Sequence, residues 1–276
     1  MKIAISTLPF QTWELEEILQ YCKNAGYNAL ELRMDFHKWS DAALPNNHYI
    51  NVRKKVEEEG ICISNLGSGI VLGSDNDEDL KKLERLFEIA GFLNTKGVRI
   101  MLGHIRLKRS ELELPLDNNG ILSWLKKADI LAAKYQKEVW IETHNEFSTG
   151  HSLECIFQKN LLPNTKVIWD IMHPLEKGEN IGTTIHCLKN YLAHVHIKDG
   201  MPWNNQELLI WKDTRLGEGI IPIEEVVTEL CHIGYEGYFS LEWESAWRNE
   251  LTTLNCDGEE ILKFPKYLMK ICEEQK

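Results

Sequence analysis

The residues best suited to chemistry lie at the ends of four successive apolar segments in the second half of the chain. These segments read VWIE, VIWD, HVHI and FSLE, and they carry Glu142, Asp170, His196 and Glu242. Carboxylates brought together repel one another and resist ionisation unless a cation neutralises them. Carboxylate oxygens with one imidazole and no thiolate suit Mn²⁺, Zn²⁺, Co²⁺ or Mg²⁺. The residue types therefore predict one divalent metal ion, provided that the fold brings the four segments together.

The third of these segments contains two histidines, His194 and His196. Side chains two residues apart on a strand point to the same face, one layer from each other. We assign His196 as the metal ligand because it lies nearer to the carboxyl end of the segment.

Strand-like apolar runs alternate with amphipathic stretches along the whole chain. Eight strands are predicted, at 2–6, 29–33, 61–65, 97–102, 138–142, 166–170, 192–197 and 238–242. Helices are predicted between them, the first from Thr12 to Gly26 and the last over 259–273. Eight βα units in 276 residues predict an α/β protein with a single (β/α)8 TIM barrel as its one domain, 1–276. The carboxyl ends of barrel strands converge at one mouth, so this fold would bring the four residues together.

Several other polar residues follow predicted strands. His173 lies three residues after Asp170, where it could donate to a substrate hydroxyl, and His104 follows the fourth strand as a candidate to line the pocket. Lys198 could stabilise an oxyanion or simply pair with Asp199.

Two charged residues, Glu31 and Arg33, end the second predicted strand, and we expect them to form an internal ion pair near the barrel rim. The region between the last two strands, 199–219, has no clear pattern, which is typical of a lid or substrate loop.

Composition limits the partners and the compartment. The formal net charge is −11 and no basic block occurs, so a nucleic-acid partner is not expected. No apolar run approaches the roughly 20 residues that span a bilayer, and the acidic N-terminal region is unlike a signal peptide. Seven cysteines without a C-x-x-C motif predict reduced thiols. We therefore expect a cytoplasmic protein without a membrane partner.

The motifs around these residues resemble those of the xylose-isomerase-like sugar phosphate isomerase/epimerase superfamily, over nearly the whole chain. They are VWIETH, VIWDIMH, HVHIKDG, LGEG and GYEGYFSLEWE. The resemblance implies that Glu142, Asp170, His196 and Glu242 are metal ligands. It also implies that the two glutamates form an acid/base pair and that His173 contacts the substrate.

The chain departs from the ketose 3-epimerases of that superfamily at one position. Those enzymes carry an arginine a few residues after the metal histidine, where this chain has Lys198-Asp199-Gly200-Met201-Pro202. Lys198 and Arg215 are the candidates to replace it at the substrate. No phosphate-binding signature is recognisable.

These features predict a divalent-metal-dependent isomerase or epimerase of a free or phosphorylated sugar. The metal would stabilise an enediolate, while Glu142 and Glu242 remove and return the proton. The expected partner is a small sugar or polyol, and assembly into a homo-oligomer is left open. The alternatives are a dehydratase of keto-cyclitols, an abasic-site endonuclease and a sugar-binding barrel without activity. The acidic charge disfavours the nuclease, and the intact four-residue set disfavours the inactive barrel.

Overall fold

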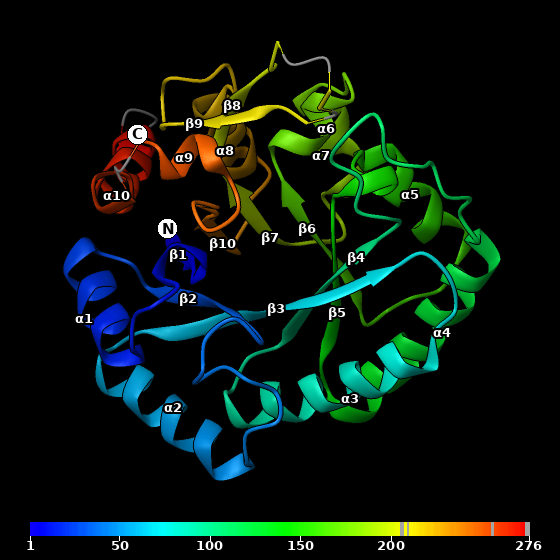
Figure 1. The fold of residues 1–276 in the computed structure, drawn as a ribbon, viewed down its shortest axis with the longest axis horizontal. Helices are drawn as coiled ribbons and strands as arrows, with labels where there is room; N and C mark the ends of the chain where they lie inside the picture. The colour runs from blue at the N-terminus through cyan, green and yellow to red at the C-terminus, as the bar shows by residue number, and fades with distance from the viewer. Residues whose placement is uncertain (205–206, 209, 255–256, 274–276) are drawn as a thin grey trace.

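The computed structural model describes the chain except residues 205–206, 209, 255–256 and 274–276. Eight parallel strands close into a barrel in the order β1-β10-β7-β6-β5-β4-β3-β2 (Figure 1). They are β1 (Lys2–Ser6), β2 (Ala29–Arg33), β3 (Cys62–Leu72), β4 (Gly97–Leu102), β5 (Glu138–Glu142), β6 (Thr165–Asp170), β7 (Leu192–Ile197) and β10 (Tyr238–Leu241). The predicted (β/α)8 barrel is thus confirmed.

Helices surround the barrel on its outside (Figure 1). They are α1 (Leu15–Ala25), α2 (Asn46–Glu58), α3 (Asp77–Phe92), α4 (Asn118–Tyr135), α5 (Gly150–Lys159), α6 (Met172–Glu176), α7 (Ile181–Leu188), α8 (Ile223–His232), α9 (Asn249–Thr252) and α10 (Asp257–Glu273). Two 3-10 turns, η1 (Leu8–Phe10) and η2 (Asn145–Phe147), follow β1 and β5. The apolar side of each long helix packs on the strands, so the core is the layer between barrel and helices.

Helix α1 illustrates how local residues set these elements. A capping box closes its first turn. The Glu14 side chain accepts the backbone N–H of Glu17, and the Glu17 side chain accepts the backbone N–H of Glu14. The predicted start at Thr12 is therefore wrong by two residues, whereas the predicted end is correct. Gly26 closes the helix in the left-handed region at φ 96°, which a residue without a Cβ adopts at low cost.

Strand β3 is longer than the predicted 61–65 and reaches Leu72. Its pairing with β4 shifts register between Gly67 and Val71. The carbonyl groups of Gly67 and Ser68, in this irregular part, accept hydrogen bonds from side chains of the barrel interior. A bulge of this kind re-aims polar groups beside a site.

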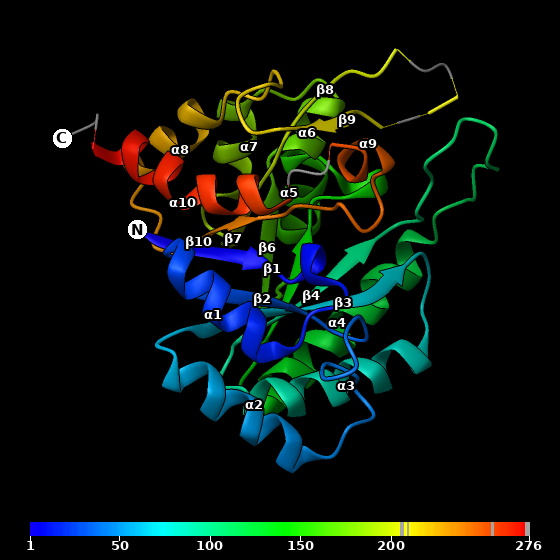
Figure 2. The ribbon, with the colours of Figure 1, turned by 60° about the vertical axis from the view of Figure 1, so that its left-hand side comes forward.

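The segment 199–219 contains a two-stranded antiparallel hairpin, β8 (Asp199–Met201) and β9 (Lys212–Thr214), where the sequence shows no pattern. Figure 2 shows this segment and the loop after β4 extending beyond the arrowheads of the barrel strands on the same side. The two loops meet at a bridge between Lys108 and Leu208, and Arg109 N donates to Glu207 O over 2.8 Å. Together they stand over the mouth of the barrel.

Six cysteines lie among the described residues, all as free thiols, and Cys256 lies outside that part of the chain. This agrees with the predicted reduced state for those six. Within the described residues, no helix has both the length and the apolar character needed to cross a bilayer.

Candidate active site

The four predicted metal ligands lie together inside the mouth of the barrel. Glu142 ends β5, Asp170 ends β6, His196 is in β7 and Glu242 follows β10 directly. One ligand atom from each lies within 4.8 Å of the others, and none of the four residues is more than 3% exposed. Their positions follow from the alternation of strands, since Asp170 pairs with His196 and His196 with Ser240, two residues before Glu242.

Two carboxylate oxygens of this group, Asp170 Oδ2 and Glu242 Oε2, are buried without a hydrogen bond of normal geometry, although Lys198 forms an ion pair with both. The other oxygen of Asp170 accepts the Met172 N–H over 2.9 Å, which fixes the direction of its side chain. Buried carboxylates are costly unless cations neutralise them, and here Lys198 is a cation that faces both of these oxygens. The carboxylate and imidazole donor set, with two buried oxygens that accept no hydrogen bond of normal geometry, fits a divalent metal ion.

Lys198 lies inside the same cluster and is not paired with Asp199. Its Nζ lies 2.8 Å from Asp170 Oδ2 and 2.7 Å from Glu242 Oε2. Burial alone would lower the pKa of Lys198, but the carboxylates of Asp170 and Glu242 raise it well above its ordinary value. The ammonium is therefore charged.

Asp199 has a structural role of its own. Its carboxylate accepts the backbone N–H groups of Gly200, Gly217, Gly219 and Ile221, which fastens the LGEG turn to the end of β7.

Arg99 is a site residue that the sequence reasoning missed. Its Nη1 donates to Glu142 Oε2 over 2.6 Å inside the barrel. Burial would raise the pKa of Glu142, but Arg99 and His196 together outweigh burial and lower this pKa to about 2. The available signal was a charged residue in the middle of the apolar strand GVRIML, where a charge needs a buried partner.

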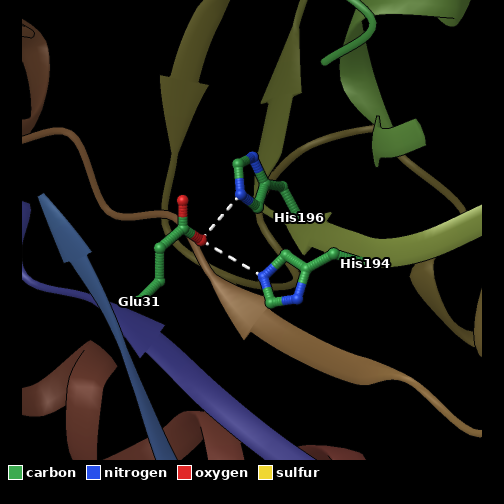
Figure 3. A group of neighbouring side chains, drawn as sticks. All are labelled: Glu31, His194 and His196. Atoms are coloured by element: carbon green, nitrogen blue, oxygen red, sulfur yellow. Dashed lines mark hydrogen bonds and ion pairs between the residues drawn. The ribbon is translucent and has the colours of Figure 1, made fainter. Parts of the chain in front are cut away.

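Glu31 pairs with histidines, so the expected Glu31–Arg33 ion pair is not formed. Figure 3 shows one carboxylate oxygen of Glu31 between the two imidazoles. This oxygen, Oε2, lies 2.8 Å from His196 Nε2 and 3.2 Å from His194 Nε2. The other ring nitrogen of His196, Nδ1, faces Glu142 Oε1 at 3.1 Å and Glu242 Oε2 at 3.3 Å. One imidazole thus links Glu31 to the four-residue group, while His194 stacks on Trp140 from the layer below.

A cavity of about 440 Å³ opens above this cluster. Glu142 and Glu242 lie at its inner end, and the two loops over the mouth contribute Ile105, Leu107, Trp203 and Leu208 to its walls. Its size is within the range of small-molecule sites. A smaller cavity of about 170 Å³ adjoins it and includes His104.

Three histidines that line these cavities have different surroundings. His173 lines both cavities; its Nδ1 lies 2.9 Å from Glu176 Oε2 and its Nε2 lies 3.6 Å from Asp170 Oδ2. Burial opposes protonation, but Asp170 and Glu176 raise the pKa of His173 to about 9. His144 lies beside it, with ring centroids 4.5 Å apart. His104 faces Glu146, not the metal ligands, with Nδ1 to Oε1 at 3.7 Å.

A family model described as "Xylose isomerase-like TIM barrel" matches residues 19–262. The chain belongs to this family. Among curated proteins it is similar to 3-dehydro-D-guloside 4-epimerase of Escherichia coli (strain K12), with 21% identity over 260 residues, 88% of this chain and 92% of that protein.

Two solved structures show the same fold. One is the probable 3-DHS dehydratase AsbF of Bacillus anthracis, at TM-score 0.74 and 17% identity, covering 98% of this chain and 99% of that one. The other is the IOLI protein with a bound zinc atom, at TM-score 0.74 and 17% identity, covering 99% of each chain. At these identities the likeness concerns the fold.

Arg215 does not replace the arginine expected from the 3-epimerases of the family. Its Nε lies 3.0 Å from Glu260 Oε1 and its Nη2 lies 2.5 Å from Glu259 Oε2, both on α10. These ion pairs hold the guanidinium against the closing helix, and the residue does not line either cavity described above. We therefore omit Arg215 from the proposed substrate site.

Proposed function

We propose that the protein is a divalent-metal-dependent isomerase or epimerase acting on a sugar or related polyol. The observation that carries the proposal is the pair Glu142 and Glu242, which line one cavity from two different strands and lie in one cluster with Asp170 and His196. Similarity to a sugar epimerase over 88% of the chain supports the same class of reaction.

Glu142, Asp170, His196 and Glu242 would hold the metal. When bound, a divalent ion polarises a substrate carbonyl and lowers the pKa of the adjacent C–H group. Glu142 and Glu242 would transfer the proton, one removing it and the other returning a proton to the opposite face or to the neighbouring carbon. Both are ionised, because Arg99 lowers the pKa of Glu142, and His196 and Lys198 outweigh burial to lower that of Glu242. Both can therefore accept a proton.

His173 would contribute a proton donor on the same wall of the cavity. With its pKa raised to about 9, its imidazole is protonated at neutral pH and lies beside Asp170. A cationic donor there can hydrogen-bond a substrate oxygen or protonate a leaving hydroxyl. The second possibility favours a dehydratase as the alternative reaction, in keeping with the fold shared with a probable dehydratase.

The proposal is tested by incubating the metal-loaded protein in deuterium oxide with a panel of ketoses and keto-cyclitols. Deuterium is expected at the carbon next to the carbonyl, and Glu142→Gln and Glu242→Gln should each slow its incorporation by about 10²- to 10⁴-fold. Glu57→Gln is a matched control, because this carboxylate pairs with Arg53 on the outside of α2.

Exchange that continues unchanged in both active-site variants would refute the assignment of the glutamates. Ultraviolet absorption of an enone product, together with loss of water, would replace the isomerase by the dehydratase.

A further inference from the structure

Arg33 stands in the wall of the large cavity without an acidic partner. Its Nη1 donates to the carbonyl oxygens of Gly67, at 3.1 Å, and Ser68. Among the described residues, no carboxylate oxygen lies within 4.0 Å of its guanidinium. The two other arginines of this cavity do have such partners: Arg99 pairs with Glu142, and Arg248 with Glu244.

The guanidinium groups of Arg33 and Arg99 converge on one oxygen. Arg99 Nη2 donates to Ser68 O over 2.9 Å, the same carbonyl that Arg33 Nη1 uses. This arrangement depends on the irregular part of β3, which turns that carbonyl toward the barrel interior. Two like charges held this close repel each other, and only one of them is neutralised by Glu142.

The charge of Arg33 persists in this setting. Burial and the neighbouring Arg99 lower its pKa to about 10, which leaves the group protonated at neutral pH. Trp247 covers one side of the guanidinium, with its ring centroid 5.6 Å from Cζ. The side chain is thus held between an aromatic ring and two carbonyl groups, next to open space.

We propose that Arg33 binds an oxyanion group of the substrate, a carboxylate or a phosphate, so that the enzyme acts on an acidic polyol and not on a neutral one. A guanidinium fork matches the planar geometry of such groups and forms two parallel hydrogen bonds with them. Nη2 and Nε of Arg33 are the donors left for it, since the hydrogen bonds to Gly67 and Ser68 use Nη1. Arg33 lines the same cavity as Glu142 and Glu242, so one small molecule could reach all three. The inference rests on the proposed function for the position of the reacting carbon.

Direct binding tests the proposal without requiring turnover. Dissociation constants are measured by calorimetry in a phosphate-free buffer with Mn²⁺ for D-fructose, 2-keto-D-gluconate and D-fructose 6-phosphate. At least one of the two anions is expected to bind about 10- to 100-fold more tightly than D-fructose. The tighter anion identifies carboxylate or phosphate as the group recognised.

Arg33→Met should remove this preference and change fructose binding less than threefold, whereas Arg33→Lys should keep part of it. Arg53→Met, which removes an arginine paired with Glu57 on the outside of α2, should leave the preference intact.

Two results would overturn the proposal. One is equal affinity of the native protein for neutral and anionic ligands, and the other is an equal loss of affinity for both kinds of ligand in Arg33→Met. The native protein could also prefer anions through Arg33 and yet catalyse no deuterium exchange. That result would support the Arg33 site and reject the proposed isomerase.

Discussion

His196 has two ring nitrogens, and their surroundings differ. Nε2 faces Glu31, while Nδ1 faces Glu142 and Glu242. Burial would raise the pKa of Glu31, but His196 and His194 lower it well below its ordinary value, so Glu31 is an ionised acceptor. An ionised acceptor at Nε2 keeps the proton on that nitrogen when Nδ1 gives up its own proton to bind a metal.

Replacing Glu31 by glutamine should therefore weaken metal binding. We expect a loss of about 10- to 100-fold in affinity for Mn²⁺ or Zn²⁺, measured by competition with a chelator. Ser240→Ala is the matched control. It removes a hydroxyl that lies 3.4 Å from the same Glu31 oxygen and leaves the Glu31 carboxylate and both imidazoles in place. Equal affinities in the native protein and Glu31→Gln would show that Glu31 does not orient His196.

The sequence predicts the metal ligands themselves better than it predicts the residues that contact them. Glu142, Asp170 and Glu242 were predictable because each ends a strand, and strand ends converge. Arg99 and the partners of Glu31 were not, because both depend on contacts across the barrel interior. Glu31 and Arg33 stand two residues apart, but the first reaches β7 and the second reaches β3.

Among the elements, β4 and β5 fit together at a glycine. A Cβ on Gly97 would lie 2.1 Å from Trp140 Cδ2, and Trp140 is the ring that stacks on His194. The missing side chain at the start of β4 thus makes room for the indole beneath the site.

Gly97→Ala should lower the free energy of unfolding by about 1–3 kcal/mol or more, because the rigid indole cannot move aside without displacing its neighbours. Gly91→Ala gives the opposite expectation. Its nearest neighbour would be Lys137 Cε at 4.0 Å, and it lies in α3, so alanine should stabilise the protein by about 0.5–1 kcal/mol. Urea denaturation of both variants measures these opposite changes in the free energy of unfolding. A Gly97→Ala protein as stable as the native one would contradict the close packing of Trp140 on Gly97.

Element positions were predictable from periodicity, and element ends less so. Seven of the eight predicted barrel strands lie within one residue of the observed bounds, because their apolar runs are bounded by polar residues. The extension of β3 and the β8–β9 hairpin were not, since GSGIVL and the segment after His196 carry no alternation. Their pairing comes from tertiary contacts with β4 and between the two loops.

The stability of the whole molecule should depend on pH through His37. This side chain is 5% exposed and its Nε2 lies 3.2 Å from Thr7 O. Burial lowers its pKa to about 4, against about 6.5 in the unfolded chain. Between these pH values His37 is protonated in the unfolded chain and neutral in the native protein. Its contribution to the free energy of unfolding is therefore complete above pH 6.5 and is lost as the pH falls toward 4.

His37→Gln removes this titration. From pH 6.5 to pH 5 the native protein should lose up to about 2 kcal/mol through His37, and the variant should lose correspondingly less. Urea denaturation at the two pH values measures the difference. Parallel losses in both proteins would show that His37 takes up its proton without opposition from the fold.

The net charge of the chain differs in sign from the charge of the arginines that line its cavity. The protein carries a net charge of −11, yet Arg33, Arg99 and Arg248 all line the cavity beside the acidic cluster. A strongly acidic exterior disfavours a nucleic acid, whereas a cationic wall suits a small acidic substrate.

We expect one divalent ion to bind among Glu142, Asp170, His196 and Glu242. Anomalous diffraction at the metal absorption edge, from crystals grown with Mn²⁺ or Zn²⁺, tests it most directly. A single strong peak should lie among these four side chains and should vanish in Asp170→Asn. The absence of a peak there would contradict the claim, as would a peak only at Glu31 and His194 or at His151, Glu154 and Cys187, the other groups within the described residues whose ligand atoms lie close enough to hold an ion.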